Sequence, residues 1–145
     1  MLQVGETRPH TPEHSDGRQA FFTVVGCMDG RVQDPMEHFG QKYFGVEYPD
    51  TITEAGIVGL IANNPSKEFI DGLKFKLLIS IDHHHSKGIL VDGHQECAGN
   101  PVDDSKHIKD IKVAVKKISE LIDNKVPVIG VFVKRAKNEW SANQI

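Results

Sequence analysis

Two cysteines and one histidine stand in two short motifs that could hold a metal ion. The first motif runs from Cys27 to Arg31, and the second, from Gly93 to Cys97, places His94 three positions before a cysteine. That spacing lets one turn direct both side chains to a single point. Thiolate and imidazole suit zinc, whereas magnesium and calcium prefer several oxygen ligands. The sequence therefore predicts a zinc site formed by Cys27, His94 and Cys97.

This ligand set is typical of a reactive zinc ion. Catalytic sites hold zinc with three protein ligands and keep a fourth position for water, whereas structural sites normally add a fourth cysteine or histidine. The chain contains only two cysteines, so a third cannot close the site. Zinc lowers the pKa of bound water from about 15.7 to about 7, which supplies a nucleophile near neutral pH.

An acid and a base follow the first cysteine at alternate positions. Asp29 and Arg31 could point to the same side of the loop and form a charge-assisted, bidentate pair beside the metal. Two roles for Asp29 follow from this placement. It could occupy the fourth zinc position, which would make the site structural, or it could accept a hydrogen bond from zinc-bound water and orient it.

Both motifs lie where buried strands are expected to end. The continuous apolar runs 21–25 and 89–91 predict strands covered on both faces. Two further strands are predicted over 45–52 and 126–133. Ligands of open parallel sheets bind beyond the carboxyl ends of the strands, which is where Cys27 and His94 fall.

Helices are predicted between these strands. A short one spans 34–40 and begins at Asp34-Pro35, and a longer one starts at Asn64-Pro65 and ends near Ser86. A third is capped by Asp103 or Asp104 and carries an apolar stripe of isoleucines and valine up to Ile122. This alternation predicts an α/β fold: one three-layer domain with a mainly parallel, about four-stranded sheet.

Composition restricts the class of protein further. The 145 residues suit one domain, predicted over 20–145 after a polar arm at 1–19, and 134–145 is interpreted as a polar tail with the only tryptophan, Trp140. A net charge of −3 without basic clusters argues against nucleic acid as a partner. The sequence has neither a secretory signal nor an apolar run long enough to span a membrane, so we expect a cytoplasmic protein.

The remaining histidines and one aspartate allow simpler interpretations. The run His83–His85 is interpreted as a solvated helix end, with a second metal site or a proton relay as the alternative. Asp92 either fixes the His94 imidazole or only ends a strand. Four further histidines are expected at the surface: His10, His14, His38 and His107.

The two motifs together resemble those of the β-carbonic anhydrases. Cys-x-Asp-x-Arg at the end of a first strand, followed by Gly-His-x-x-Cys after a later strand, follows the order of that family over residues 21–133. Residues 50–56 occupy the place of the family's Arg-Asn-Ala-Gly turn. The resemblance implies zinc bound by Cys27, His94 and Cys97, and an Asp29–Arg31 catalytic dyad. It also implies a carbonate dehydratase that hydrates carbon dioxide reversibly to bicarbonate and a proton through zinc-bound hydroxide.

Two other functions use the same site. One is a hydrolase of carbonyl sulfide or carbon disulfide, and the other is a non-catalytic zinc-binding or anion-sensing module. The resemblance further implies a homodimer or a higher even oligomer. The apolar segment 57–61 is a candidate for the subunit contact, and the alternative is a helix buried within one chain.

Overall fold

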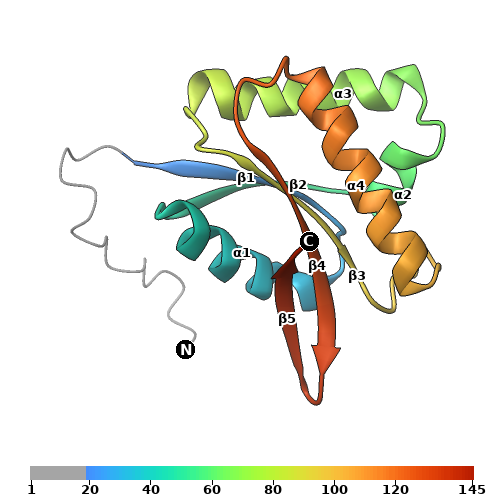
Figure 1. Ribbon diagram of the computed structural model, residues 1–145. Helices are drawn as coiled ribbons and strands as arrows, with labels where there is room; N and C mark the ends of the chain where they lie inside the picture. The colour runs from blue at the N-terminus through green and yellow to red at the C-terminus, as the bar shows by residue number, and fades with distance from the viewer. Residues whose placement is uncertain (1–18) are drawn as a thin grey trace, which may run out of the picture.

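The buried strands that precede the two motifs form the centre of a five-stranded sheet (Figure 1). A computed structural model describes residues 19–145, and the strand order is β2-β1-β3-β4-β5. Strands β1 (Phe21–Gly26), β2 (Tyr48–Thr53), β3 (Ile89–His94) and β4 (Val128–Ala136) are parallel to one another. Strand β5 (Glu139–Gln144) pairs antiparallel with β4. The α/β fold and the mainly parallel sheet are confirmed.

The fifth strand corrects the predicted polar tail. Residues 134–145 complete β4 and form β5, which two residues, 137–138, connect to β4. Along β5 the half-buried Trp140 and Ala142 alternate with exposed side chains. An edge strand packs only one face, so it needs no continuous apolar run and resembles a polar tail in the sequence.

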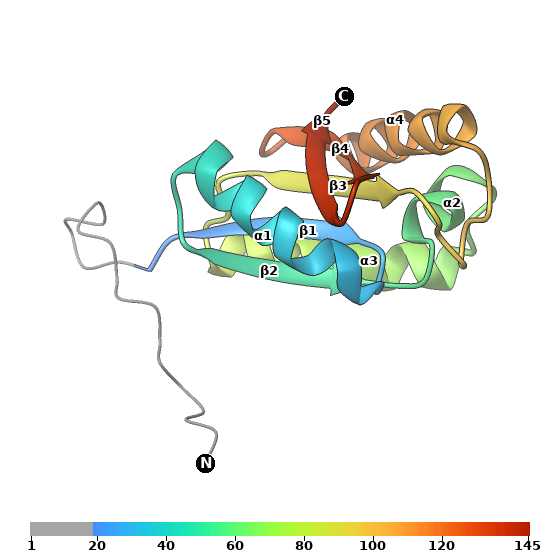
Figure 2. The same ribbon diagram turned by 90° about the horizontal axis from the view of Figure 1, so that it is seen from below.

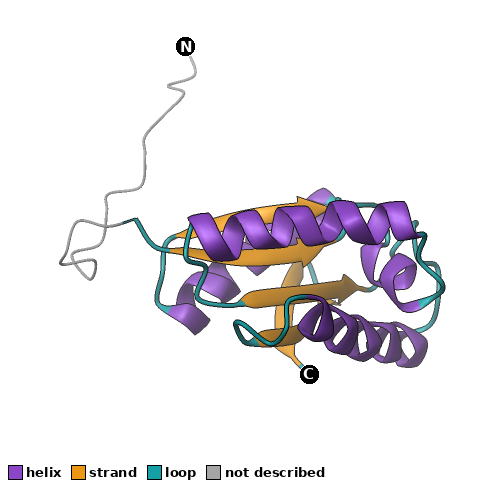
Figure 3. Cartoon of the chain, turned by 90° about the horizontal axis from the view of Figure 1, so that it is seen from above, coloured by secondary structure: helices purple, strands orange, loops and turns teal. Residues whose placement is uncertain are grey.

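Helices cover both faces of the sheet and make the three predicted layers. Helix α1 (Gly30–Phe44) lies on one face, in front of the sheet in Figure 2. The other face carries α2 (Ile57–Ala62), α3 (Lys67–Leu78) and α4 (Asp104–Leu121), and α3 and α4 lie in front of the sheet in Figure 3. A π-helical turn, η1 (Ile79–His83), continues α3. No helix within residues 19–145 is long and apolar enough to cross a membrane.

Each face of the sheet has its own apolar core. Successive side chains of a strand point to opposite faces, so Phe22 and Val24 pack with α1, whereas Val25 packs with α2, α3 and α4. The segment 57–61 belongs to the second core, where only Leu60 of its large side chains is exposed. It is therefore a helix buried within one chain.

Two predicted helix starts are wrong and one is confirmed. Helix α1 is capped by Asp29, and Pro35 lies inside the helix. Helix α3 is capped by Ser66, whose hydroxyl accepts from the Phe69 amide, while Asn64 has a positive φ of 52°. Helix α4 begins as expected, with Asp103 accepting from the Lys106 amide. The predicted arm, 1–19, lies outside the described residues except for its last residue.

Candidate metal centre

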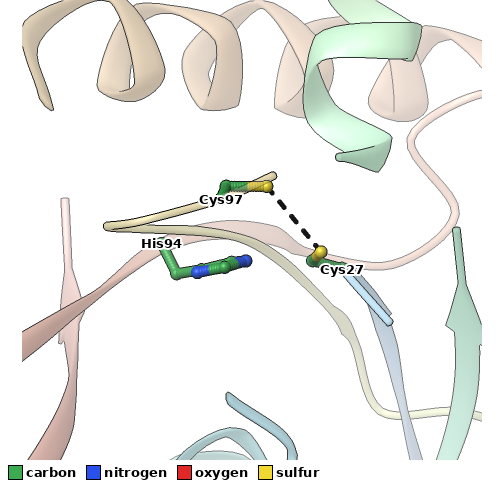
Figure 4. Close-up of side chains that lie close together, drawn as sticks. All are labelled: Cys27, His94 and Cys97. Atoms are coloured by element: carbon green, nitrogen blue, oxygen red, sulfur yellow. Dashed lines mark hydrogen bonds between the residues drawn. The ribbon is translucent and has the colours of Figure 1, made fainter. Parts of the chain in front are cut away.

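The three predicted ligands meet at the carboxyl end of the sheet (Figure 4). Cys27 directly follows β1, and His94 is the last residue of the adjacent strand β3. Cys97 returns from the turn after β3. All three side chains are buried, their possible ligand atoms lie within 4.8 Å of one another, and the two sulfurs are 3.8 Å apart. Among the described residues, no other group of three His, Cys, Asp or Glu side chains lies close enough together to hold a metal ion.

The His94 ring is held in the orientation that a metal ligand needs. Its Nδ1 lies 2.7 Å from the Gln95 carbonyl oxygen. A carbonyl only accepts hydrogen bonds, so Nδ1 must carry the proton and Nε2 of the neutral ring keeps a free lone pair. That Nε2 is buried and has no hydrogen-bond partner among the described residues. Because an unpaired buried polar atom is costly, the site suits a cation that would accept this lone pair.

The two thiols differ in their ease of ionisation. Burial raises the pKa of Cys27, but the His94 ring in its protonated form and the amides of Gly56 and Asp29 outweigh burial and lower the pKa to about 7. The Gly56 amide lies 3.4 Å from the Cys27 sulfur. Burial raises the pKa of Cys97, and the neighbouring Cys27 raises it further. Cys27 is therefore the thiol prepared to act as thiolate before a cation arrives.

Backbone conformation and close packing hold the turn that carries Cys97. Glu96, just before it, has a left-handed φ of 58°. After it, Asn100 donates to the buried Asp110 carboxylate at 3.1 Å, which ties the loop to α4. Gly99 packs so closely on Gly56 that a Cβ on Gly56 would lie 2.3 Å from the Gly99 carbonyl carbon. Residues 50–56 thus reach the centre at Gly56.

Asp29 and Arg31 form the predicted pair. The Asp29 carboxylate accepts from the Arg31 amide at 2.9 Å, from Nε at 3.0 Å and from Nη2 at 2.7 Å. The arginine side chain holds the pKa of Asp29 low, at about 2, so the carboxylate stays ionised at neutral pH. The same carboxylate caps α1 and faces the arginine.

Comparisons with known proteins agree with this geometry. Residues 17–145 match the protein family described as "Putative carbonic anhydrase". The chain belongs to this carbonic anhydrase family. No curated protein matches the sequence.

Comparison with solved structures shows that this chain has the β-carbonic anhydrase fold. Isoform I of the Trichomonas vaginalis β-carbonic anhydrase is 21% identical with a TM-score of 0.54, and the match covers 83% of this chain and 80% of that one. One of two tetrameric β-carbonic anhydrases from Sordaria macrospora is 16% identical with a TM-score of 0.56, covering 95% and 87%. A carbonic anhydrase from Streptococcus mutans is 16% identical with a TM-score of 0.50, covering 86% and 80%.

Three residues that the sequence analysis did not select surround Arg31 in this family member. Glu96, Arg135 and Trp140 come from the turn after β3, from β4 and from β5. Glu96 forms salt bridges with both arginines, and both guanidinium groups lie close to the indole. The one sequence signal was the alternation of Trp140 and Ala142 with polar residues, which could have indicated the strand β5 but not its contact with Arg31.

Asp92 has a role that neither interpretation described. It is buried beneath the Cys27 loop, and its Oδ1 accepts from the Cys27 amide at 3.3 Å. Burial raises the pKa of Asp92 to about 7. The His94 ring is oriented by the Gln95 carbonyl instead. Gly26 leaves room for this carboxyl group, because a Cβ there would lie 1.9 Å from Asp92 Oδ2.

The other histidines among residues 19–145 lie outside the centre, and one of them is not at the surface. His107 is buried in the first turn of α4, and its ring centroid is 6.2 Å from that of His94, so the surface prediction is wrong. Its Nε2 packs against Gly93, the only residue type small enough there. His38 is exposed, and His84 pairs with Asp50 at 2.7 Å near the exposed end of η1. His10 and His14 lie outside the described residues.

Proposed function

We propose that this chain is a zinc-dependent carbonic anhydrase that hydrates carbon dioxide reversibly to bicarbonate and a proton. The observation that carries the proposal is the cluster of Cys27, His94 and Cys97, three buried ligand groups within 4.8 Å at the carboxyl end of the sheet. Membership of a carbonic anhydrase family supports the proposed reaction class. The ligand set and the reaction together point to a catalytic metal and not to a structural staple.

The donor chemistry fits zinc. Two thiols, one of them with a pKa of about 7, and an imidazole with a free buried Nε2 match the soft and borderline ligands that zinc selects. Zinc bound there would act as a Lewis acid that lowers the pKa of water to about 7. The residues of the chain would hold the ion, fix the imidazole through the Gln95 carbonyl and keep the thiols away from bulk solvent.

Asp29 supports a catalytic centre over a closed one. Both of its carboxylate oxygens accept hydrogen bonds from Arg31, which favours an orienting role over ligation of the metal. An ionised carboxylate can only accept, so Asp29 would accept a hydrogen bond from a neighbouring O–H group and fix the direction of that group's lone pairs. In this proposal Asp29 orients the attacking oxygen and Arg31 orients Asp29.

We also propose an even-numbered homo-oligomer in the cytoplasm. The Sordaria macrospora relatives in the structural comparison are tetrameric, which supports assembly of this chain as well. Of the segment 57–61, Leu60 is the large side chain available for such a contact, since the other large ones are buried within the chain. Both cysteines are free thiols, and a reducing compartment would preserve them as ligands.

One preparation tests the metal and the reaction together. We expect about one zinc per chain by elemental analysis and carbon dioxide hydration in a stopped-flow pH assay. Carbonyl sulfide and carbon disulfide are assayed in parallel, because a preference for either would replace the proposed substrate. Zinc-loaded protein inactive on all three would favour the non-catalytic module.

Matched carboxylate variants test the dyad. Asp29→Asn should retain zinc and lose about a hundredfold in kcat, because a neutral amide binds Arg31 differently and misplaces the oxygen acceptor. Asp34→Asn changes an exposed carboxylate of the same helix and should leave kcat unaltered. Wild-type kcat in Asp29→Asn would contradict the orienting role.

A further inference from the structure

Trp140 brings an indole from the end of the chain against the arginine of the dyad. Its side chain is half-buried on the α1 side of the sheet, and the Arg31 Cζ lies 4.8 Å from the ring centroid. The Arg135 Cζ lies 4.9 Å from the same centroid. A guanidinium group at this distance from an indole is attracted by the electrons of the ring and loses freedom to move.

Glu96 completes the set of contacts around Arg31. Its carboxylate accepts from Arg135 Nε at 2.8 Å and lies 3.5 Å from Arg31 Nη1, while its carbonyl oxygen accepts from Arg31 Nη2 at 3.1 Å. Nε and Nη2 of Arg31 also bind Asp29. Every guanidinium nitrogen of Arg31 thus has a partner, and the indole lies against the group.

The contacts with Trp140 and Glu96 restrict the Arg31 side chain more than its ion pair with Asp29 alone would. The Arg31 side chain is 39% exposed, and an ion pair at such a surface gains little, because water competes and both side chains lose rotamer freedom. A flexible arginine would hold Asp29 in several orientations. The indole and the Glu96 carboxylate restrict the guanidinium to one of them.

We propose that Trp140 is a positioning residue of the hydration site, acting through Arg31 on Asp29. This inference rests on the proposed function. Glu96 assists by pairing with the Arg31 guanidinium, and Arg135 holds the Glu96 carboxylate in place. The β4–β5 hairpin is then a working part of the site, and its loss would change turnover without removing a metal ligand.

A purely structural role for Trp140 predicts something different. The indole also packs against the apolar core under α1 and lies edge-on to His94, with centroids 6.3 Å apart. Removing it will therefore cost stability in either case. Only the positioning role predicts that kcat falls in molecules that are folded and fully loaded with zinc.

Three variants separate these roles. We expect Trp140→Leu to lose about tenfold in kcat at unchanged KM and zinc content, and Trp140→Phe, which keeps an aromatic face, to stay within about threefold of wild type. Tyr43→Leu removes a half-exposed aromatic from α1, which packs on Phe39 and Phe44, and serves as the stability control with wild-type kcat. Wild-type kcat in Trp140→Leu, or an equal loss in Tyr43→Leu, would overturn the inference.

A second measurement does not depend on hydration activity. The Arg31 Nε–H donates to Asp29 and should exchange slowly with solvent in ¹⁵N-labelled, zinc-loaded protein, its resonance being assigned by its loss in Arg31→Lys. Trp140→Leu should accelerate this exchange by about tenfold or more, and Tyr43→Leu should not. Unchanged exchange in Trp140→Leu would overturn the inference. An inactive wild type with this exchange pattern would refute the proposed function alone.

Discussion

Substitution of Gly56 tests how closely the two loops of the metal centre pack. Gly56 has a φ of 60°, and a Cβ there would lie 2.3 Å from the carbonyl carbon of Gly99 and 2.5 Å from its oxygen. These are backbone atoms, so no side-chain rotation can relieve the overlap. Gly56→Ala must therefore move one loop away from the other.

Gly45 supplies a matched control for the backbone conformation. It has a φ of 67°, but a Cβ added there would meet nothing within 4 Å. Gly45→Ala should destabilise the chain only through the left-handed conformation, by about 1–2 kcal/mol. Gly56→Ala should lose the same amount and a further 1–3 kcal/mol or so from overpacking, giving about 2–5 kcal/mol in total.

The displacement should also weaken the metal site. The Gly56 amide donates to the Cys27 sulfur at 3.4 Å, and this hydrogen bond stabilises the thiolate. Zinc raises the free energy of unfolding by an amount set by its affinity for the folded chain. We expect this increase to be smaller in Gly56→Ala than in wild type and unaltered in Gly45→Ala.

Urea unfolding in chelator and in zinc measures both effects. The free energy of unfolding in chelator gives the packing cost, and the difference between the two conditions gives the contribution of the metal. Equal destabilisation of Gly56→Ala and Gly45→Ala would show that the loops do not pack as described. In that case, some contact other than that between Gly56 and Gly99 would hold the turn that carries Cys97 beside Cys27.

Further predictions concern stability, metal content and pH. Gly72→Ala should raise the free energy of unfolding by about 1 kcal/mol in a urea titration, because this exposed position within α3 has open space for a methyl group. Cys97→Ala should reduce zinc measured by elemental analysis to a small fraction of wild type. Asp110→Ala should destabilise the chain by about 2–4 kcal/mol in urea, since it leaves the buried Asn100 amide without its acceptor. Burial lowers the pKa of His107 below 6.5, so the unfolded chain takes up its proton first, and this residue removes stability as pH falls from about 7. Between pH 7.5 and about 5.5 in chelator, the free energy of unfolding should fall less in His107→Gln than in wild type. Equal pH dependence of the free energy of unfolding in the two proteins would contradict the lowered pKa of His107.

The elements that carry the candidate metal ligands could be predicted because their signals are local. Strands β1 and β3 are covered on both faces by helices, so their apolar side chains form continuous runs that end at the motifs. Helix α4 has a capping aspartate, Asp103, and a regular apolar stripe. The side chains that follow β1 and β3 then come together because parallel strands end at the same edge of the sheet, which is a property of the topology.

The start of α1 could not be predicted because two caps competed. Asp34-Pro35 has the usual residue types for a helix start, yet Asp29 is the cap and Pro35 lies inside the helix. Asp29 can cap because its carboxylate accepts from the Arg31 amide while the Arg31 side chain binds the same group. A residue with a proposed chemical role thus also sets the local structure, and helix propensity alone does not distinguish the two roles.

The surroundings of Arg31 were missed for a different reason, which is distance along the chain. Trp140 contacts Arg31 only because β5 folds back on β4 and places its half-buried face over the start of α1. Alternation in a short polar strand is a weak signal, and nothing near Trp140 in the sequence indicates an arginine so far away. The two motifs suffice to bring the three candidate metal ligands together, but in our proposal the orientation of Asp29 depends on a third segment. A search for positioning residues in related chains should therefore begin at the edge strand that packs beside the dyad and not within the motifs themselves.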